Sequence, residues 1–209
     1  MTPNAKMIDL RIARVKNSSA LSFDAVFPER DEAWEAQLPV WRPGRYERAN
    51  FAQYVIKMAG VLENGSEIKL EKSDLHRWVI PAGIHRLRWI FHADILNAGS
   101  TFVSDDLQYV NPVNCFIYDR SYHALGYKIT LSDIPENWDI ATALPTVDGC
   151  LIAHDMQHVM DSPWMASPKL WHETYQVEDS DKMVNFHVWT YGDAPPQQKK
   201  FMADHLAFS

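Results

Sequence analysis

Two histidines, His154 and His158, have the spacing that most clearly suggests chemistry. Four residues apart on a helix they would share one face, which is how zinc peptidases bind their metal. In that motif a glutamate follows the first histidine and acts as general base on the metal-bound water. Here Asp155 takes that place, and its carboxylate would fall one methylene short. We therefore predict no metal site, and a minimal zinc enzyme built on this pair is the weakest of three functional hypotheses.

A second group of polar side chains is concentrated in residues 105–114. Around Tyr109 it contains Asp105, Asp106, Gln108, Asn111 and Asn114. A lone acidic pair in a loop is usually solvated, but carboxylate and amide oxygens also accept charge-assisted hydrogen bonds from an ammonium group. The group is thus a candidate substrate-binding loop, and the alternative is a hydrogen-bonded loop that only stabilises the fold.

Other kinds of catalytic site find no support in the sequence. There is no G-x-S-x-G nucleophile elbow, and the glycines are too isolated to form a phosphate-binding loop. The two cysteines, Cys115 and Cys150, offer no zinc spacing. Two reduced core residues are the favoured interpretation of this pair, and a disulfide between them remains open.

The charge and hydropathy of the chain also exclude several partners. Its 209 residues carry a formal net charge of −7, which gives no electrostatic footprint for nucleic acid or an anionic membrane. No apolar run approaches the roughly 18 residues of a membrane span. The N-terminus has no signal peptide, so we expect a cytoplasmic protein, or a periplasmic one if its N-terminus has been trimmed.

The stretch LPVWRPGRY, residues 38–46, is the one around which we expect the fold to be organised. Pro43 sets the first angle of a turn and Gly44 accepts the positive φ that follows. Trp41 and Tyr46 flank this turn, and their large rings would insert into a core. The stretch therefore predicts a buried aromatic corner that joins two sheets.

Short alternating segments and frequent turns predict an all-β fold, a sandwich or saddle of antiparallel sheets with one short helix at 154–160. The segments 7–15 and 21–27 form a predicted hairpin, and Asn64-Gly65 is the strongest hairpin turn in the chain. Further strands are expected at 34–41, 55–62, 77–80, 85–93, 102–104, 115–118, 122–131, 138–141, 150–153, 172–177 and 185–191.

The tail differs from the rest of the chain. We expect residues 1–192 to form a β-rich domain and 193–209 to form a linker and a helix over 197–207. Phe201, Met202, His205 and Leu206 would lie on roughly one side of that helix. Such a helix indicates a further domain downstream, and the alternative is a terminal helix docked on the sandwich.

Several stretches together resemble the N-terminal domain of the glycyl-aminopeptidase family of zinc metallopeptidases. They follow the family's order and cover most of the chain: LPVWRPGRY with Asn50-Phe51-Ala52, then Asp105-Asp106 followed by NPVNCFIY at 111–118, then ITLSDIPENWDIATALP ending at Pro145, and the loop Met160-Asp161-Ser162-Pro163. Within them Trp41, Pro43, Gly44, Tyr46, Asp161 and Pro163 are structural motif positions.

The resemblance implies a β-rich first domain followed by a thermolysin-like zinc domain and a PDZ-like domain. The zinc motif H-E-x-x-H would belong to the second domain, beyond this sequence, so no catalytic residue is carried onto this chain. The expected partners are the chain's own downstream catalytic domain and, through it, a peptide substrate; the fragment alone should be inactive. In related enzymes the β domain lends a wall, and sometimes an amine-binding group, to the cleft, and the loop 105–114 is the candidate for that role.

A hypothesis of a different class is a free-standing β-sandwich that binds carbohydrate or protein. Exposed aromatic side chains such as Trp164 and Trp171 could stack on sugars, although in a chain with eight tryptophans a core position is favoured for each. An H-E-x-x-H motif encoded downstream of Ser209 would favour the peptidase, and a stop codon there would favour the binding module.

Overall fold

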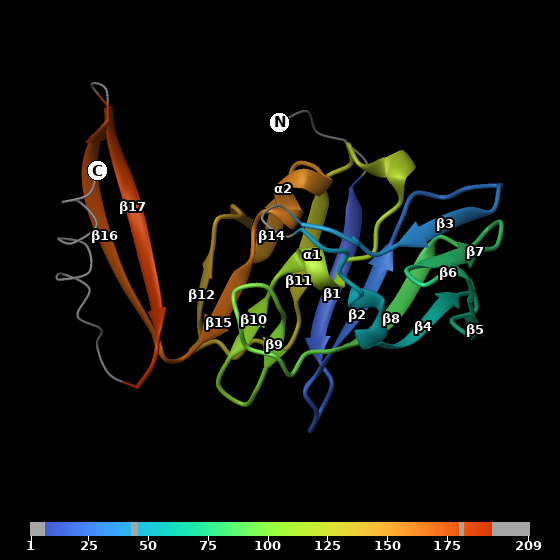
Figure 1. Cartoon of the computed structure of the whole chain (residues 1–209), viewed down its shortest axis with the longest axis horizontal. Helices are drawn as coiled ribbons and strands as arrows, with labels where there is room; N and C mark the ends of the chain where they lie inside the picture. Colours follow the sequence, from blue (N-terminus) through green and yellow to red (C-terminus); the bar gives the residue numbers. More distant parts are fainter. Residues whose placement is uncertain (1–6, 43–45, 180–181, 194–209) are drawn as a thin grey trace.

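The computed structural model describes residues 7–42, 46–179 and 182–193, and its largest element is an eight-stranded sheet. The strand order is β13-β14-β11-β1-β2-β8-β4-β5 (Figure 1). The strands are β1 (Ile8–Arg14), β2 (Ala20–Val26), β4 (Val55–Val61), β5 (Glu67–Lys69), β8 (Arg86–His92), β11 (Tyr127–Leu131), β13 (Thr146–Val147) and β14 (Cys150–Ala153). Neighbours are antiparallel except β1 and β11, which pair in parallel, so the expected antiparallel sheet contains one exception.

Two smaller sheets accompany the large one. A four-stranded sheet has the order β12-β15-β10-β9, and a three-stranded sheet the order β3-β7-β6. Their strands are β3 (Trp34–Gln37), β6 (Glu71–Asp74), β7 (Arg77–Ile80), β9 (Phe102–Val103), β10 (Gln108–Val110), β12 (Asp139–Thr142) and β15 (Trp164–Ser167). The helices are short: α1 (Pro112–Cys115), α2 (Met156–Met160) and the 3-10 turns η1 (Phe51–Tyr54) and η2 (Arg120–Tyr122). The prediction of an all-β fold is confirmed.

One hydrophobic core joins the three sheets. On β1 the buried side chains of Ile8, Leu10 and Ile12 alternate with more exposed ones, as the period of a half-buried strand requires. The ring of Phe23 on β2 stacks on Trp89 of β8, with 4.9 Å between the ring centroids. These contacts place the inner face of the eight-stranded sheet against the core and leave its outer face to charged side chains.

The turn between β4 and β5 shows how local sequence sets the register of a hairpin. Gly65 has φ of 82°, a conformation that glycine adopts without steric cost. The Asn64 Oδ1 accepts hydrogen bonds from the backbone N–H (2.9 Å) and the hydroxyl (2.7 Å) of Ser66. The hairpin predicted from Asn64-Gly65 is therefore confirmed, and the β1–β2 hairpin is confirmed as well.

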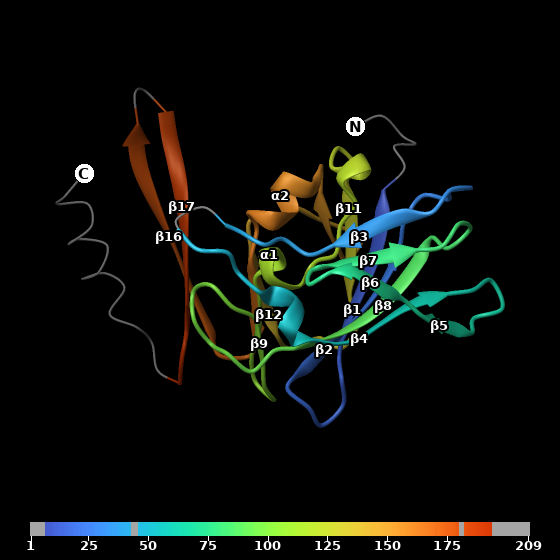
Figure 2. The ribbon, with the colours of Figure 1, turned by 45° about the vertical axis from the view of Figure 1, so that its right-hand side comes forward.

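A long hairpin, β16 (Leu170–Asp179) and β17 (Lys182–Tyr191), extends away from the three sheets (Figures 1 and 2). Its ten cross-strand pairs run from Leu170–Tyr191 to Asp179–Lys182. Within the described residues the two strands pair only with each other. The hairpin is thus attached to the β domain through its base.

Two local predictions have different outcomes. The expected strand at 115–118 is partly the helix α1, because Pro112 occupies the first helical position, where a missing N–H costs nothing. The chain becomes extended again at Phe116, and Tyr118 then forms an isolated bridge with Gln37. The helix expected at 154–160 is confirmed as α2, with the Asp155 carboxylate as its N-cap.

The predicted aromatic corner is not buried. Trp41 is 54% exposed and Tyr46 is fully exposed, so neither ring inserts into the core. Pro43 and Gly44, the predicted turn, lie outside the described residues, as does the helix expected over 197–207. Both cysteines are free and buried, which settles the open pairing in favour of reduced thiols. Among the described residues, no helix has the length and apolarity to cross a membrane.

Candidate functional site

The predicted binding loop 105–114 is divided by the structure into two groups. Asp105 and Asp106 lie in the turn between β9 and β10. Tyr109 lies in β10, Asn111 precedes α1 and Asn114 lies within α1. The two groups therefore lie toward opposite ends of the short strand β10 and have different hydrogen-bond partners.

The two aspartates of the turn have different surroundings. Asp105 binds Arg14 at 2.7 Å, but its side chain is 98% exposed. Asp106 accepts hydrogen bonds from Lys169 (2.8 Å) and from the hydroxyl of Ser104 (2.8 Å). The hydrogen bond from Lys169, which has the largest effect, and the one from Ser104 hold the pKa of Asp106 below its ordinary value. Asp106 is therefore an ionised structural anchor.

That anchor holds the base of the long hairpin. Lys169, directly before β16, also binds the carboxylate of Asp193, directly beyond β17, at 2.6 Å. The two ends are further joined by Gly192 N–H, which donates to the Lys169 carbonyl at 3.1 Å. The Trp171 indole N–H donates to the Gly192 carbonyl at 2.9 Å. Asp106, predicted as a binding residue, thus fixes where the hairpin leaves the β domain.

The second group holds the backbone loop 95–101. The Tyr109 hydroxyl and the Asn111 amide donate to the Ala98 carbonyl at 3.3 and 3.4 Å. The Asn114 amide donates to the Gly99 carbonyl at 2.8 Å. Three side chains that are close in the sequence therefore position one loop by their hydrogen-bond donors.

A small cavity of about 120 Å³ lies beneath this loop. Its wall includes the side chains of Phe51, Tyr54, Phe91, Ile95, Thr101 and Asn114. Asn114 is 2% exposed, and its Oδ1 is buried without a hydrogen-bond partner. An unpaired buried acceptor costs free energy unless a donor reaches it, so this oxygen is suited to a ligand with an N–H group.

The LPVWRPGRY stretch contacts the same loop. The Arg42 guanidinium donates to the Ala98 carbonyl at 3.4 Å. It also lies so close to Gly99 that a Cβ there would be 2.2 Å from Arg42 Nη2, so a larger residue at this position would displace the Arg42 side chain. Burial raises the pKa of Tyr109 above its ordinary value despite the opposing charge of Arg42. The exposed ring of Trp41 adjoins Arg42 in the sequence.

The histidine pair does not have the geometry of a zinc site. The His158 Nδ1 accepts the backbone N–H of His154 at 3.2 Å, and the two ring centroids are 4.1 Å apart. The Asp155 carboxylate accepts the backbone N–H of His158 as the helix cap, and it also lies 3.4 Å from His154 Nε2. Across residues 7–42, 46–179 and 182–193, no group of three His, Cys, Asp or Glu side chains could hold a metal ion. Asp161 ends α2, and its carboxylate accepts the Gln157 amide at 2.7 Å.

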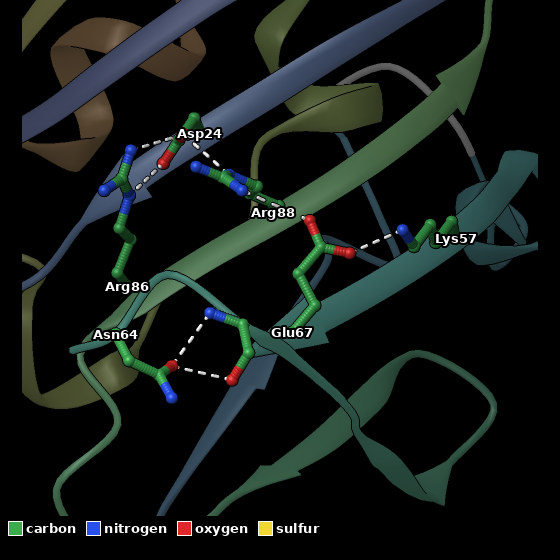
Figure 3. Close-up of polar contacts among 7 residues, drawn as sticks. Asp24, Lys57, Asn64, Glu67, Arg86 and Arg88 are labelled. Atoms are coloured by element: carbon green, nitrogen blue, oxygen red, sulfur yellow. Dashed lines mark hydrogen bonds and ion pairs between the residues drawn. The ribbon is translucent and has the colours of Figure 1, made fainter. Parts of the chain in front are cut away.

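A network of charged side chains covers the outer face of the large sheet (Figure 3). Asp24 on β2 binds Arg86 and Arg88 on β8, while Glu67 on β5 binds Arg88 and also Lys57 on β4. Each carboxylate is therefore shared between two cations. The network joins four neighbouring strands and contains no nucleophile, so we assign it to stability.

Sequence reasoning identified the polar loop but missed its partners. Lys169 and Asp193 lie far along the chain from Asp106, and nothing local marks them as its neighbours. Every residue has a backbone carbonyl, so the sequence does not show that those of Ala98 and Gly99 are the acceptors. Arg42 was part of the quoted stretch, but its contact with Gly99 has no signal in the sequence. Pro163, a second expected motif position, is exposed in the loop after α2.

The fold is similar to part of a larger protein of known structure. The crystal structure of an aminopeptidase N family protein from Idiomarina loihiensis matches 95% of this chain with a TM-score of 0.81 at 19% identity. The present chain spans only 35% of that protein's chain. An M1 zinc metallopeptidase from Deinococcus radiodurans matches more weakly, with a TM-score of 0.39 at 14% identity over 93% of this chain and 48% of that one.

Residues 13–168 match the Peptidase M61 N-terminal domain, and the chain therefore belongs to that family. The comparison with curated proteins found no match.

Proposed function

We propose that this chain is the non-catalytic N-terminal β domain of a zinc metallo-aminopeptidase of the glycyl-aminopeptidase type, which packs on a downstream catalytic domain and frames its substrate cleft. The observation that carries the proposal is the match of residues 13–168 to the Peptidase M61 N-terminal domain. Because His154 and His158 do not fit a zinc site, the proposal assigns the metal to the downstream domain. The 209-residue chain alone should not hydrolyse peptides.

The proposal gives the binding role to Asn114 and not to the two aspartates. The Asp106 carboxylate forms an ion pair with Lys169, and the Asp105 carboxylate is exposed and paired with Arg14. Asn114 lines a small cavity together with Phe51 and Tyr54, and its buried amide oxygen has no hydrogen-bond partner among the described residues, so a rotation of the side chain could offer it to a donor there. An ammonium group could donate to the amide oxygen and also gain from the aromatic faces. The small volume suits the amino end of a substrate with a small first residue.

The test uses a longer polypeptide that includes the proposed catalytic domain. Such a polypeptide should bind zinc and cleave aminoacyl substrates, whereas the 209-residue chain should not. Replacing Asn114→Leu should raise KM for substrates with a free amine by roughly 10- to 100-fold, the value of a hydrogen bond to a charged group. The value of kcat should fall as well, because the α-amine lies one carbon from the scissile carbonyl and holding the amine also positions that carbonyl.

Asp105→Asn is the matched control, since this exposed side chain should leave KM unchanged. Thermal unfolding of both variants separates a loss of binding from a loss of stability. An unchanged KM in a folded Asn114→Leu enzyme would eliminate the amine-binding role. Absence of peptidase activity in the longer polypeptide would eliminate the whole proposal. Of the two tryptophans that could stack on sugars, Trp164 is buried as expected, whereas Trp171 is 38% exposed and donates its indole N–H to the Gly192 carbonyl. The family match does not favour the free-standing carbohydrate- or protein-binding module.

A further inference from the structure

The long hairpin carries two histidines and a threonine side by side. Thr174 on β16 and His187 on β17 are direct cross-strand partners, and His172 precedes Thr174 by two residues on β16. Cross-strand partners share one face of a sheet, and so do side chains two residues apart on a strand. His172, Thr174 and His187 therefore point to the same side of the hairpin, and all three are exposed there.

Polar atoms of these three side chains converge. His172 Nε2 lies 3.0 Å from His187 Nδ1. The Thr174 hydroxyl oxygen lies 3.5 Å from the same His172 nitrogen and 3.3 Å from the same His187 nitrogen. In a tetrahedral zinc site with Zn–N distances of about 2.0–2.1 Å, two ligand atoms lie about 3.3 Å apart. The two imidazole nitrogens are therefore close to the separation that one bound metal ion requires, and a small rotation of the rings would direct both at it.

The contact between the two rings leaves room for a cation in place of a proton. A neutral imidazole has one N–H and one unprotonated nitrogen, so the two facing nitrogens share a single proton. A metal ion binds the unprotonated form of imidazole and releases the proton on binding. The His172 ring also stacks on Trp189, with 4.0 Å between the ring centroids and 10° between the planes. This contact holds the His172 ring in place, so less freedom is lost when an ion binds.

We propose that His172 and His187 form a binding site for a divalent transition-metal ion of the class that prefers imidazole, such as Zn²⁺, Cu²⁺ or Ni²⁺. The two protein ligands are His172 Nε2 and His187 Nδ1. The described residues contain no group of three His, Cys, Asp or Glu side chains that could hold an ion, so water takes the remaining positions. The Thr174 hydroxyl is placed to hydrogen-bond to one such water. This site is separate from the proposed function, which assigns its zinc to the downstream domain.

An ion bound here joins the two strands of the hairpin. His172 belongs to β16 and His187 to β17, and within the described residues these strands pair only with each other (Figure 1). A hairpin of two strands is only marginally stable in water by itself. A ligand that binds the paired strands but not the separated ones stabilises the pairing by mass action. The bound ion should therefore suppress local opening of β16 and β17.

The other histidine pair of the chain provides a matched control. The ring centroids of His154 and His158 are 4.1 Å apart, so this pair is also close. However, His158 Nδ1 accepts the backbone N–H of His154, and His154 Nε2 lies beside the Asp155 carboxylate. Because His158 Nδ1 is already engaged, we expect this pair to bind the ion more weakly than the pair on the hairpin.

Calorimetric titration of the 209-residue chain with ZnCl2 tests the proposal. The chain contains no H-E-x-x-H motif, and it should be prepared without a histidine tag. The wild type should bind one ion. His172→Gln and His187→Gln should each weaken binding by roughly tenfold or more, because a single imidazole loses the advantage of two linked ligands. His158→Gln should bind zinc as the wild type does, and circular dichroism checks that each variant keeps the β fold.

Hydrogen exchange provides a second readout, which reports on the hairpin itself. At a zinc concentration about 100 times the Kd, the amides of β16 and β17 should exchange up to roughly a hundredfold more slowly than without zinc. EDTA should restore the faster exchange. In His187→Gln, the same concentration of zinc should leave the exchange of both strands unchanged.

Three results would overturn the proposal. The first is an absence of zinc binding, or equal affinity in the wild type and both hairpin variants. The second is a loss of binding in His158→Gln alone, which would place the ion at α2. The third is one ion per two chains with a zinc-dependent dimer in light scattering, which would show that the histidines bridge two copies. All three leave the proposed function intact, because that function is tested on the longer polypeptide.

Discussion

The Asp24 carboxylate is shared by two arginines on the outer face of the large sheet, and its removal should lower the stability of the β domain. Asp24 accepts two hydrogen bonds from Arg86, both 2.7 Å, and one from Arg88 at 2.8 Å (Figure 3). Burial alone would raise its pKa, but the hydrogen bonds and charges of Arg86 and Arg88 outweigh burial and leave the pKa of Asp24 below its ordinary value. Replacing Asp24→Asn keeps the shape and removes the charge that both arginines share.

The size of the effect follows from exposure and geometry. The Asp24 side chain is 22% exposed, whereas those of Arg86 and Arg88 are 42% and 37% exposed, so solvent screens part of the attraction. A surface pair contributes about 0–1 kcal/mol and a hydrogen bond to a charged group about 1.5–3 kcal/mol. We expect Asp24→Asn to lower the free energy of unfolding by about 1–3 kcal/mol at pH 7. The unfolding temperature should fall by roughly 3–10 °C.

Urea unfolding as a function of pH is the decisive assay. Because the folded pKa of Asp24 is lowered, its contribution is complete above the unfolded pKa of about 3.9 and is lost as the pH falls through the folded pKa. The difference between wild type and Asp24→Asn should therefore be constant from pH 7 to pH 5 and shrink below about pH 4.

Asp9→Asn is the control, because Asp9 is exposed on the neighbouring strand β1. This variant should change the free energy of unfolding by less than about 0.5 kcal/mol. Equal stability of Asp24→Asn and wild type at pH 7, or a difference that is as large at pH 3 as at pH 7, would refute the assignment of the network to stability.

Two further predictions concern the core. Gly60→Ala places a Cβ 2.9 Å from Ile84 Cγ2, so the free energy of unfolding measured in urea should fall by about 1–3 kcal/mol. Gly192→Ala is the control and should be neutral, because a Cβ there meets no atom within 4 Å. Equal stabilities of the two variants would contradict the packing around Gly60. Burial raises the pKa of the Cys115 thiol far above its ordinary value, so a thiol reagent should label Cys115 only after unfolding, and rapid labelling of the native protein would show that the site opens.

The parts of the fold that the sequence predicts are those set by short-range rules. The alternation in β1 and the Asn64-Gly65 turn each depend on neighbours within a few residues, and both are confirmed. The parallel pairing of β1 with β11 has no such local determinant, because its two strands lie more than a hundred residues apart. Pro112 is compatible with both a loop and a helix start, and only the packing of α1 decides between them.

The candidate site follows the same rule. Composition marks the loop 105–114 as polar, but the role of each member depends on a distant partner. Asp106 is an anchor because Lys169 reaches it, and Asn114 retains a free acceptor because only its amide nitrogen finds a carbonyl. The Asp106 carboxylate is therefore paired with a cation, whereas the Asn114 amide oxygen has no hydrogen-bond partner among the described residues.

The exposed Trp41 shows why burial itself could not be predicted for every aromatic residue. An aromatic ring beside a turn indicates a packed position, but the sequence does not say whether the packing partner belongs to the same domain. Trp41 is 54% exposed here, and Phe186 of the β16–β17 hairpin is 49% exposed. Under the proposed function both would be covered by the downstream domain. The sequence would then have predicted correctly that Trp41 packs, but the packing would be at an interface between two domains and not in the core of the β domain.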